Sequence, residues 1–275
     1  FKAANENAPQ EMQNFLMRAL GFIGDPQLEQ SALAQWIVGM AIRIQTSGWK
    51  ESRTLIAELT VIQAELTDFA PKQILVLSRE FEMAENETLG RSFDLKVVSK
   101  KVLAVGTHVE VKTIQNPFYQ VSDLTRPIKL TLEKIQSDRE RFSSTTDLDQ
   151  RAGRRLVIIV PNSFDQLQTF PVKGNQQILL EPNGDLYLLA AGNRKIPKGN
   201  LFEHVHQNLA KIEGFEDLDM IDVRDVTGKR IASYASRTIV GTLLENSAFR
   251  TTPTGIKLEE IFRSPKNGWI RIPRN

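Results

Sequence analysis

The stretch MIDVRDVTGKRIASY, residues 220–234, is the part of the sequence that indicates a fold most clearly. Two runs of alternating apolar and polar residues flank Thr227-Gly228, and this pattern predicts two antiparallel strands joined by a tight turn. A second pair of strands is predicted at 178–189, where Asn183-Gly184 separates two apolar runs. The C-terminal part of the chain is therefore expected to be built on antiparallel sheet.

The same period of two begins after an acidic, glycine-containing stretch at 82–90. Further strands are expected at 93–97, 102–105, 108–114 and 128–133, because each would have one apolar and one polar face. Residues 156–160 are continuously apolar, which predicts a strand buried on both faces. Short helices are expected at about 200–212 and 258–262, with loops around Gly241, Asn246 and 251–255 and a last strand at 269–272.

The first 90 residues have the period of helices. Helices are expected at 9–23, from Pro26 to about Ser47, at 51–69, and from Ile74 through Met83. The third of these has apolar residues at alternating spacings of four and three, typical of a helix-pairing seam: Leu55, Leu59, Ile62, Leu66 and Phe69. The seam is short, which favours packing inside the helix's own bundle over pairing with a second chain.

The predicted fold class is α+β, with an N-terminal helical bundle followed by a mainly antiparallel β-sheet region with a few short helices. The predicted domains are a helical domain at 1–90 and an α+β domain at 91–275. The polar stretch at 136–154 is expected to be a loop. The sequence leaves open whether the second domain divides at this loop into two subdomains.

The charges are unevenly distributed along the chain. The net charge is +2, from 35 basic and 33 acidic residues, which is small for a protein that coats nucleic acid. Residues 1–92 have an acidic excess and residues 93–275 a basic one. Candidate contacts for anions or nucleic acid are the basic residues of expected loops: Arg151, Arg154, Arg155, Arg194, Lys195 and Lys198. Proteins that bind single strands usually interleave aromatic residues with basic ones, whereas the aromatic residues here are scattered, so nucleic-acid binding is not favoured.

No motif for catalysis or cofactor binding is present. The chain has no cysteine, which excludes disulfides, thiolate catalysis and Cys-ligated metal sites. The motifs GxSxG, HExxH, GxGxxG and the Walker P-loop do not occur, so a non-enzymatic protein without a cofactor is favoured. His204 and His206 would share a face only on a strand, and the helix expected there makes a metal site the least favoured alternative.

Two further expectations concern the surface. Asp222 and Arg224 share one face of their strand and are expected to form a solvated ion pair. No apolar run reaches the about 18–20 residues that cross a bilayer, so no membrane insertion is expected.

The stretch from Asp222 to Ser233 resembles the central hairpin of extracytoplasmic Cache-type and PAS-like sensory domains. Such domains have a strand, an Asp-x-x-Gly turn, a second strand, a small-residue segment and a glycine-containing turn. In this chain, Ser233 and residues 238–244 would occupy the last two of these places. Residues 178–189 have the same arrangement of strand, glycine turn and strand. The resemblance covers about residues 176–272 and implies a sheet that binds a small ligand.

The function favoured by the sequence is a non-enzymatic binding or assembly module that acts through protein–protein contacts. Its partners would be other protein subunits, a homo-oligomer included. Two alternatives stay open: an extracytoplasmic small-ligand sensory domain, and a nucleic-acid-binding protein that uses the basic loops of the C-terminal region. The sequence does not indicate a compartment.

Overall fold

The computed structural model describes residues 17, 19–26, 28, 30–31, 33–38, 56–64, 73–77, 94–99, 107–114, 116–142, 153–214, 217–245, 247–263 and 268–272. The chain forms two compact units, and neither is continuous in sequence. Unit 1 comprises Phe1–Thr113 and Glu133–Val157, and unit 2 comprises Ile114–Leu132 and Ile158–Asn275. Helices and antiparallel strands occur in both, so the α+β class is confirmed. The predicted domains, 1–90 and 91–275, overlap these units only in part and stay a prediction.

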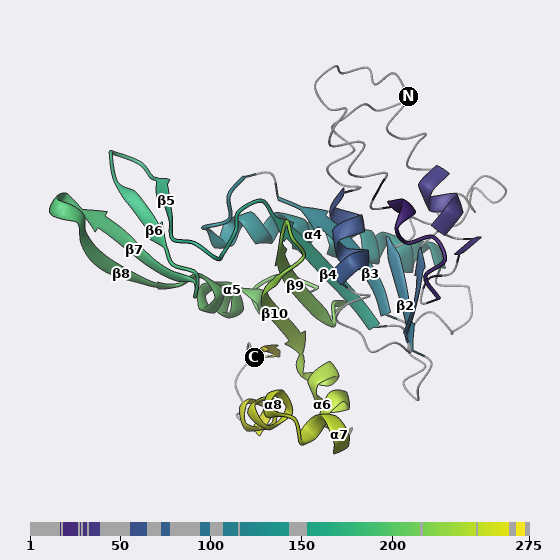
Figure 1. Cartoon of the computed structure of the whole chain (residues 1–275). Coiled ribbons are helices and arrows are strands. Elements are labelled where there is room, and N and C mark those ends of the chain that lie inside the picture. The colour runs from purple at the N-terminus through teal and green to yellow at the C-terminus, as the bar shows by residue number, and fades with distance from the viewer. Residues whose placement is uncertain are drawn as a thin grey trace, which may run out of the picture. The chain divides into compact units, whose positions relative to one another are not determined.

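Unit 1 contains three antiparallel strands in the hydrogen-bonded order β1-β2-β3, of which β2 and β3 are labelled in Figure 1. They are β1 (Gln73–Leu77), β2 (Leu95–Ser99) and β3 (Thr107–Thr113). The helix predicted from Ile74 is therefore wrong, because a short apolar run does not distinguish a helix from a buried strand. The strand expected at 102–105 lies outside the described residues, and β2 pairs with β3 instead.

The N-terminal helical bundle is not confirmed. Helical residues are described at 33–38 and 56–64, and Trp36 Nε1 donates a hydrogen bond to Glu58 Oε2 at 3.2 Å. Of the predicted seam, Leu59 and Ile62 are fully buried within the chain. Leu55, Leu66 and Phe69 lie outside the described part of the chain, so the seam stays a prediction.

Helix α4 (Val121–Phe142) replaces both the strand expected at 128–133 and the first part of the loop expected at 136–154. Ile128, Leu132 and Ile135 are buried, at the spacing of one helical face, whereas Leu130 is 47% exposed. Of the alternating apolar residues, those at 128 and 132 therefore belong to the buried face of a helix. Pro127 lies inside this helix, and Thr131 Oγ1 donates a hydrogen bond to the Pro127 carbonyl at 2.9 Å.

Unit 2 contains a four-stranded antiparallel sheet, which we call the β5–β8 sheet, and a second group of strands around β9 and β10 (Figure 1). Both hairpins predicted from glycine turns are confirmed, as β6–β7 and β9–β10. The strands are β5 (Gln168–Pro171), β6 (Gln177–Leu180), β7 (Asp185–Ala190), β8 (Arg194–Asn200), β9 (Met220–Asp225), β10 (Arg230–Ser236) and β11 (Trp269–Arg271). Strand β4 (Gly153–Val160) is divided between the two units, and its residues 156–160 are buried as predicted.

Four helices complete unit 2: α5 (Leu201–Leu209), α6 (Arg237–Glu245), α7 (Ser247–Arg250) and α8 (Pro253–Arg263). Gly241, expected in a loop, lies inside α6, where its position faces the ring of Phe262. Val240 and Leu258 pack with Ala235 and Ile270 in a small apolar core under these helices. Among the helices that the structure describes, none is both long and apolar enough to cross a membrane.

Candidate functional site: the β5–β8 sheet

The β5–β8 sheet has one face on which an apolar row crosses all four strands. Phe170, Ile178, Leu188 and Ile196 are in register, so their side chains lie on the same face. Phe170 is buried, and Tyr119 stacks on its ring with centroids 4.6 Å apart. The other three residues, which we call the apolar row, are only half-buried. This face is therefore covered at the β5 end and partly open from β6 to β8.

On the opposite face of the sheet, Lys195 lies over Tyr187. The Nζ atom of Lys195 lies 5.2 Å from the centroid of the Tyr187 ring and 2.9 Å from Glu181 Oε1. The hydrogen bond to Glu181 raises the pKa of Lys195 above its ordinary value. Since the stem of Lys195 crosses Tyr187 to reach this carboxylate, the tyrosine ring is not free to stack on a ligand.

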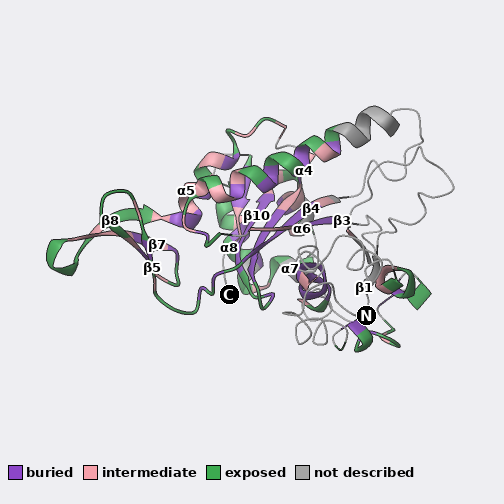
Figure 2. Ribbon diagram, turned by 90° about the horizontal axis from the view of Figure 1, so that it is seen from above, coloured by how far each residue is buried: buried purple, intermediate pink, exposed green. Residues whose placement is uncertain are grey.

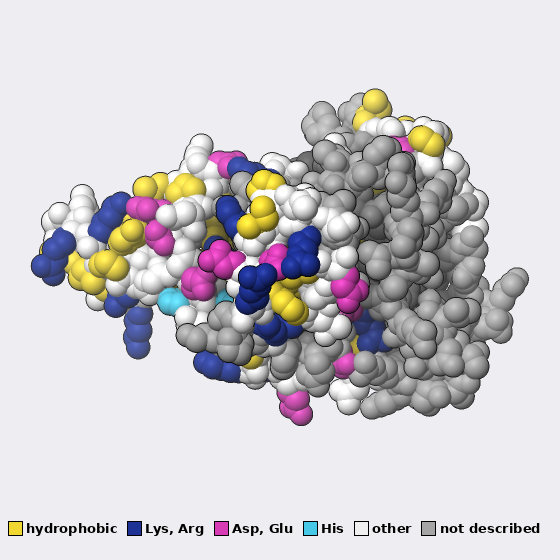
Figure 3. All heavy atoms as spheres, turned by 90° about the horizontal axis from the view of Figure 1, so that it is seen from below, with side chains coloured by type: hydrophobic (Ala, Val, Ile, Leu, Met, Phe, Trp, Pro, Cys, Tyr) yellow, Lys and Arg dark blue, Asp and Glu magenta, His cyan; other side chains and the backbone are white. Residues whose placement is uncertain are grey.

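Three of the predicted anion contacts lie on this sheet. Arg194, Lys195 and Lys198 are exposed, but they belong to strand β8 and not to a loop. Arg194 precedes Ile196 by two residues and so lies on the face of the apolar row. Figure 2 shows that exposure increases toward the end of the sheet farthest from α5, and Figure 3 shows basic side chains beside apolar ones there. Arg194 therefore borders the half-open apolar surface, whereas Lys195 lies on the opposite face of the sheet.

Two of the remaining predicted anion contacts, Arg154 and Arg155, belong to strand β4. Arg155 lies on β4 and is only 4% exposed, which corrects the expectation that it is a solvent-facing contact. Arg154 is half-buried on the same strand, and Arg151 lies outside the described residues. The strand starts earlier than its apolar run suggested, so Arg154 and Arg155 belong to it and not to a preceding linker.

The two edges of the sheet are protected against pairing with another strand. β5 and β8 are the edge strands, and they contain Pro171 and Pro197. Proline has no backbone N–H to donate, and the register between β7 and β8 shifts next to Pro197. Addition of a partner strand is therefore disfavoured at both edges, which leaves a face of the sheet as the available contact surface.

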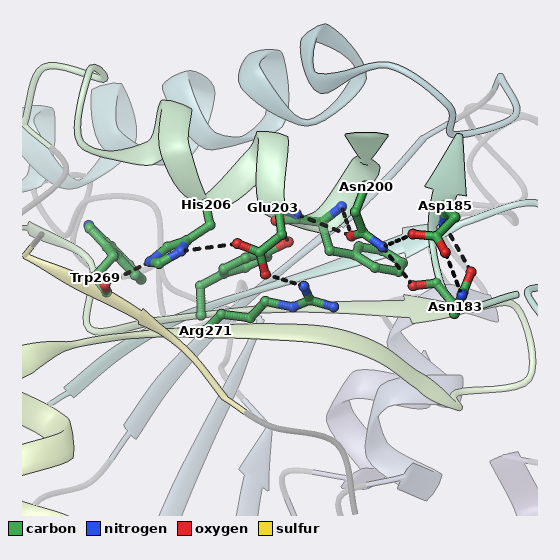
Figure 4. A network of polar contacts seen from close by, with 9 residues as sticks. Asn183, Asp185, Asn200, Glu203, His206, Trp269 and Arg271 are labelled. Carbon is green, nitrogen blue, oxygen red and sulfur yellow. Dashed lines mark hydrogen bonds and ion pairs between the residues drawn. The ribbon is translucent and has the colours of Figure 1, made fainter. Parts of the chain in front are cut away.

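The base of the sheet is fixed to helix α5 by one side chain, Asn200 (Figure 4). Its Oδ1 accepts from the backbone N–H groups of Phe202 and Glu203 at 3.0 and 3.3 Å, and so caps α5. Its Nδ2 donates to the carbonyl of Asn183 at 3.1 Å and to Asp185 Oδ1 at 2.9 Å, in the β6–β7 turn. Asn200 therefore connects the turn of one hairpin with the start of the helix.

Gly184 makes this connection possible. It has a φ of +93°, and a Cβ at this position would lie 2.5 Å from Cδ2 of the Phe202 ring. Because Phe202 is fully buried, the ring has no space into which it could move. The β6–β7 turn therefore requires glycine both for its backbone conformation and for the close approach to α5.

Helix α5 is fixed on its other side to strand β11 (Figure 4). Glu203 forms an ion pair with Arg271, whose guanidinium lies 5.3 Å from the Phe202 ring. The Nε2 of His206 donates to the carbonyl of Trp269 at 2.8 Å. Oε2 of Glu203 also lies 3.9 Å from Nδ1 of His206. One continuous polar network thus runs from the β6–β7 turn through α5 to β11, formed by Asn200, Glu203, His206, Trp269 and Arg271.

The two histidines of the least favoured metal hypothesis lie on the predicted helix and point to different groups. His206 binds the Trp269 carbonyl, whereas His204 packs so closely on Gly199 that a Cβ there would lie 2.5 Å from its Nε2. Among the residues with described positions, no three His, Asp or Glu side chains form a group that could hold a metal ion.

Replacing Asn200 by alanine is expected to lower the free energy of unfolding of unit 2 by about 1–2 kcal/mol, because α5 loses its N-cap. Asn200→Ser keeps an oxygen that can accept from the helix but loses both bonds to the β6–β7 turn, and should fall between the two. Thermal unfolding of the three proteins measures the effect. An alanine variant as stable as the parent would contradict the role of the cap.

A cluster of buried charges lies on the β9–β10 hairpin. Asp222 and Arg224 are 0% and 1% exposed, with 3.9 Å between Arg224 Nη2 and Asp222 Oδ2. Ser233 donates its hydroxyl to Asp222 Oδ1, and Arg230 Nε lies 3.5 Å from the same oxygen. The expectation of a solvated pair is wrong, because both faces of β9 are buried.

The turn of this hairpin explains Thr227-Gly228. One oxygen of Asp225, Oδ1, accepts from the N–H groups of Thr227 and Lys229 at 2.9 and 3.1 Å. Lys229 forms an exposed ion pair with Asp165. The Asp225 carboxylate thus accepts hydrogen bonds from backbone N–H groups of the turn and holds the hairpin closed. Thr227 and Lys229 therefore have a structural role in this turn.

A second buried cluster lies in unit 1. Glu110 is 2% exposed, and its oxygens lie 2.5 Å from the Nζ atoms of Lys112 and Lys134. Asp94 Oδ2 accepts from the backbone N–H of Val111 at 2.6 Å. Burial, and then the negative charge of Glu110, raise the pKa of Asp94 to about 7 against the effect of the lysines. Asp94 therefore titrates near neutral pH.

Comparison with known proteins finds no match to a protein-family model, to a curated protein or to a solved structure. Residues 238–244 lie in helix α6, where the resemblance of the β9–β10 hairpin to sensory domains implies a small-residue segment and a glycine-containing turn.

Proposed function

We propose that the protein is a binding module that acts through protein–protein contacts, and that the β5–β8 sheet is its contact surface. The half-buried apolar row, Ile178, Leu188 and Ile196, supports this proposal above all. Covering such side chains contributes roughly 25 cal/mol per Å² of apolar surface, from which the costs of association are subtracted. Three of them in one row provide a continuous patch that a partner can cover.

The anchoring of the sheet supports the same function. Asn200 holds the β6–β7 turn against α5, and α5 is held against β11 by Glu203 and His206. A surface fixed in this way loses little conformational freedom when it binds, and so less of the contact energy is spent on ordering. The protected edges direct a partner to the face of the sheet and away from strand addition.

Site-specific photo-cross-linking in the native host tests this proposal. A photoreactive phenylalanine analogue is placed at Leu188 and, in a separate variant, at Ile178. The matched control carries it at Ile256, an exposed aliphatic residue of α8 that is 58% exposed. We expect one discrete adduct from the two sheet positions and none from the control, with mass spectrometry identifying the partner.

The mass of the adduct separates the forms of the proposal. An adduct of twice the chain's mass identifies a second copy, and any other discrete mass identifies a different protein. Equal adduct patterns from Leu188 and Ile256, or no adduct from either sheet position, would show that this face is not a contact surface.

A further inference from the structure

We propose that the partner of the β5–β8 sheet is an acidic protein segment with aliphatic side chains, which docks on the face of the apolar row. This inference rests on the proposed function and adds the chemistry of the partner. Three observations support it: the exposed cations of the sheet, the position of Arg194 on the face of the row, and the contacts that already cover the rings of Tyr119 and Tyr187.

The exposed cations of the β5–β8 sheet and its β5–β6 turn are available, and one of them, Arg194, lies on the face of the apolar row. Lys173, Arg194 and Lys198 are exposed, and no residue that the structure describes forms an ion pair with them. The two acidic residues of the sheet are already engaged. Glu181 binds Lys195, and Asp185 binds the side chains of Asn183 and Asn200. A partner therefore meets cations without competing acids, and acidic side chains are complementary to this surface.

The spacing of the sheet defines what the partner must present. Arg194 and Ile196 are two residues apart on one strand, so their side chains lie about 7 Å apart on the same face. The row from Ile178 to Ile196 spans two strand-to-strand steps, or about 10 Å. A matching segment carries two or three aliphatic side chains over about 10 Å, with a carboxylate about 7 Å to the side of one of them.

The aromatic rings favour a protein over a nucleic acid as the polyanionic partner. Single-stranded nucleic acids are held by aromatic faces on which bases stack. Tyr119 is already stacked on Phe170, and the ring of Tyr187 lies under Lys195. The open positions of this face are aliphatic instead, which suits Leu, Ile, Val and Met side chains.

Selection from a phage-displayed random dodecapeptide library on the immobilised full chain tests the inference. We expect the enriched peptides to combine an excess of Asp and Glu with aliphatic residues. A synthetic peptide of the enriched sequence should bind Arg194→Glu about tenfold more weakly than the parent protein, a change of about 1.4 kcal/mol. Lys257→Glu, the same charge change at an exposed lysine of α8, is the matched control and should leave binding unchanged.

The outcomes separate this inference from the proposed function. If the enriched peptides have no acidic excess and their binding is lost in Leu188→Glu, the inference of an acidic partner is overturned. The proposal that this face is a contact surface then still stands. Absence of enrichment, or equal weakening by Arg194→Glu and Lys257→Glu, would overturn the inference, while the cross-linking result decides the proposed function independently. Binding of a single-stranded oligonucleotide that is lost in Arg194→Glu would assign the cations to nucleic acid and also overturn it.

Discussion

Replacing Asp222 by alanine is expected to lower the free energy of unfolding of unit 2 by about 3–5 kcal/mol. The change removes one partner of a buried pair and leaves the Arg224 guanidinium, which is 1% exposed, without its carboxylate. The hydroxyl of Ser233 loses its acceptor as well. Urea unfolding followed by tryptophan fluorescence measures the effect, since the buried Trp269 lies on β11, which pairs with β10.

Two further variants test the physical reason for this effect. Asp165→Ala breaks the ion pair between Asp165 and Lys229, whose side chains are 55% and 59% exposed, respectively. This variant should lower the free energy of unfolding by no more than about 1 kcal/mol. Replacing Asp222 by leucine together with Arg224 by methionine removes both buried charges and should be milder than Asp222→Ala alone. Burial is not the cause of the Asp222→Ala effect if loss of the exposed pair lowers the free energy of unfolding as much as loss of the buried pair. The same conclusion follows if the double variant is the least stable protein.

The stability of unit 1 is expected to decrease with rising pH between about pH 4 and 7, at roughly 1.4 kcal/mol per pH unit from Asp94 alone. The pKa of Asp94 rises from its ordinary 3.8 in the unfolded chain to about 7 in the folded protein. In this interval the folded state binds a proton that the unfolded state has lost. The contribution of Asp94 is therefore fully present below the unfolded pKa and is lost as the pH passes the folded one.

Asp94→Asn isolates this contribution. The asparagine keeps an oxygen that can accept from the Val111 N–H and resembles the protonated carboxyl, with no charge beside Glu110. We expect the variant to equal the parent protein near pH 4 and to be more stable by a few kcal/mol above about pH 7. Urea titrations monitored by far-UV circular dichroism at several pH values measure the difference. A difference between the two proteins that does not change with pH would contradict the raised pKa.

The parts of the fold that the sequence predicted are those with a local signal. The β6–β7 and β9–β10 hairpins follow from alternation around a glycine turn, and α5 follows from the spacing of Leu201, Val205 and Leu209. Strand β8 has no comparable signal, because RKIPKGN has one β-branched residue and contains lysine, proline and glycine. It becomes a strand by pairing with β7, and pairing is a property of the fold.

The candidate site was predicted only in part for the same reason. Arg194, Lys195 and Lys198 could be named because charge is visible in a sequence, whereas the exposure of Leu188 depends on which face the rest of unit 2 covers. Asp94 and Glu110 are 16 positions apart and meet through the β2–β3 pairing. No local pattern indicates such a meeting, nor that the polar positions of β9 are enclosed.

The division of the chain between the two units has a consequence for synthesis on the ribosome. The chain passes between units after Thr113, Leu132 and Val157, so unit 1 lacks its last segment until Val157 has been made. The first segment of unit 2, Ile114–Leu132, is synthesised before that point and must wait for Ile158 and the residues beyond. Domains of ordinary proteins can fold one after another as they emerge. Here the nascent chain carries an unfinished part of the second unit while the first is being completed, and no single cut can release either unit intact.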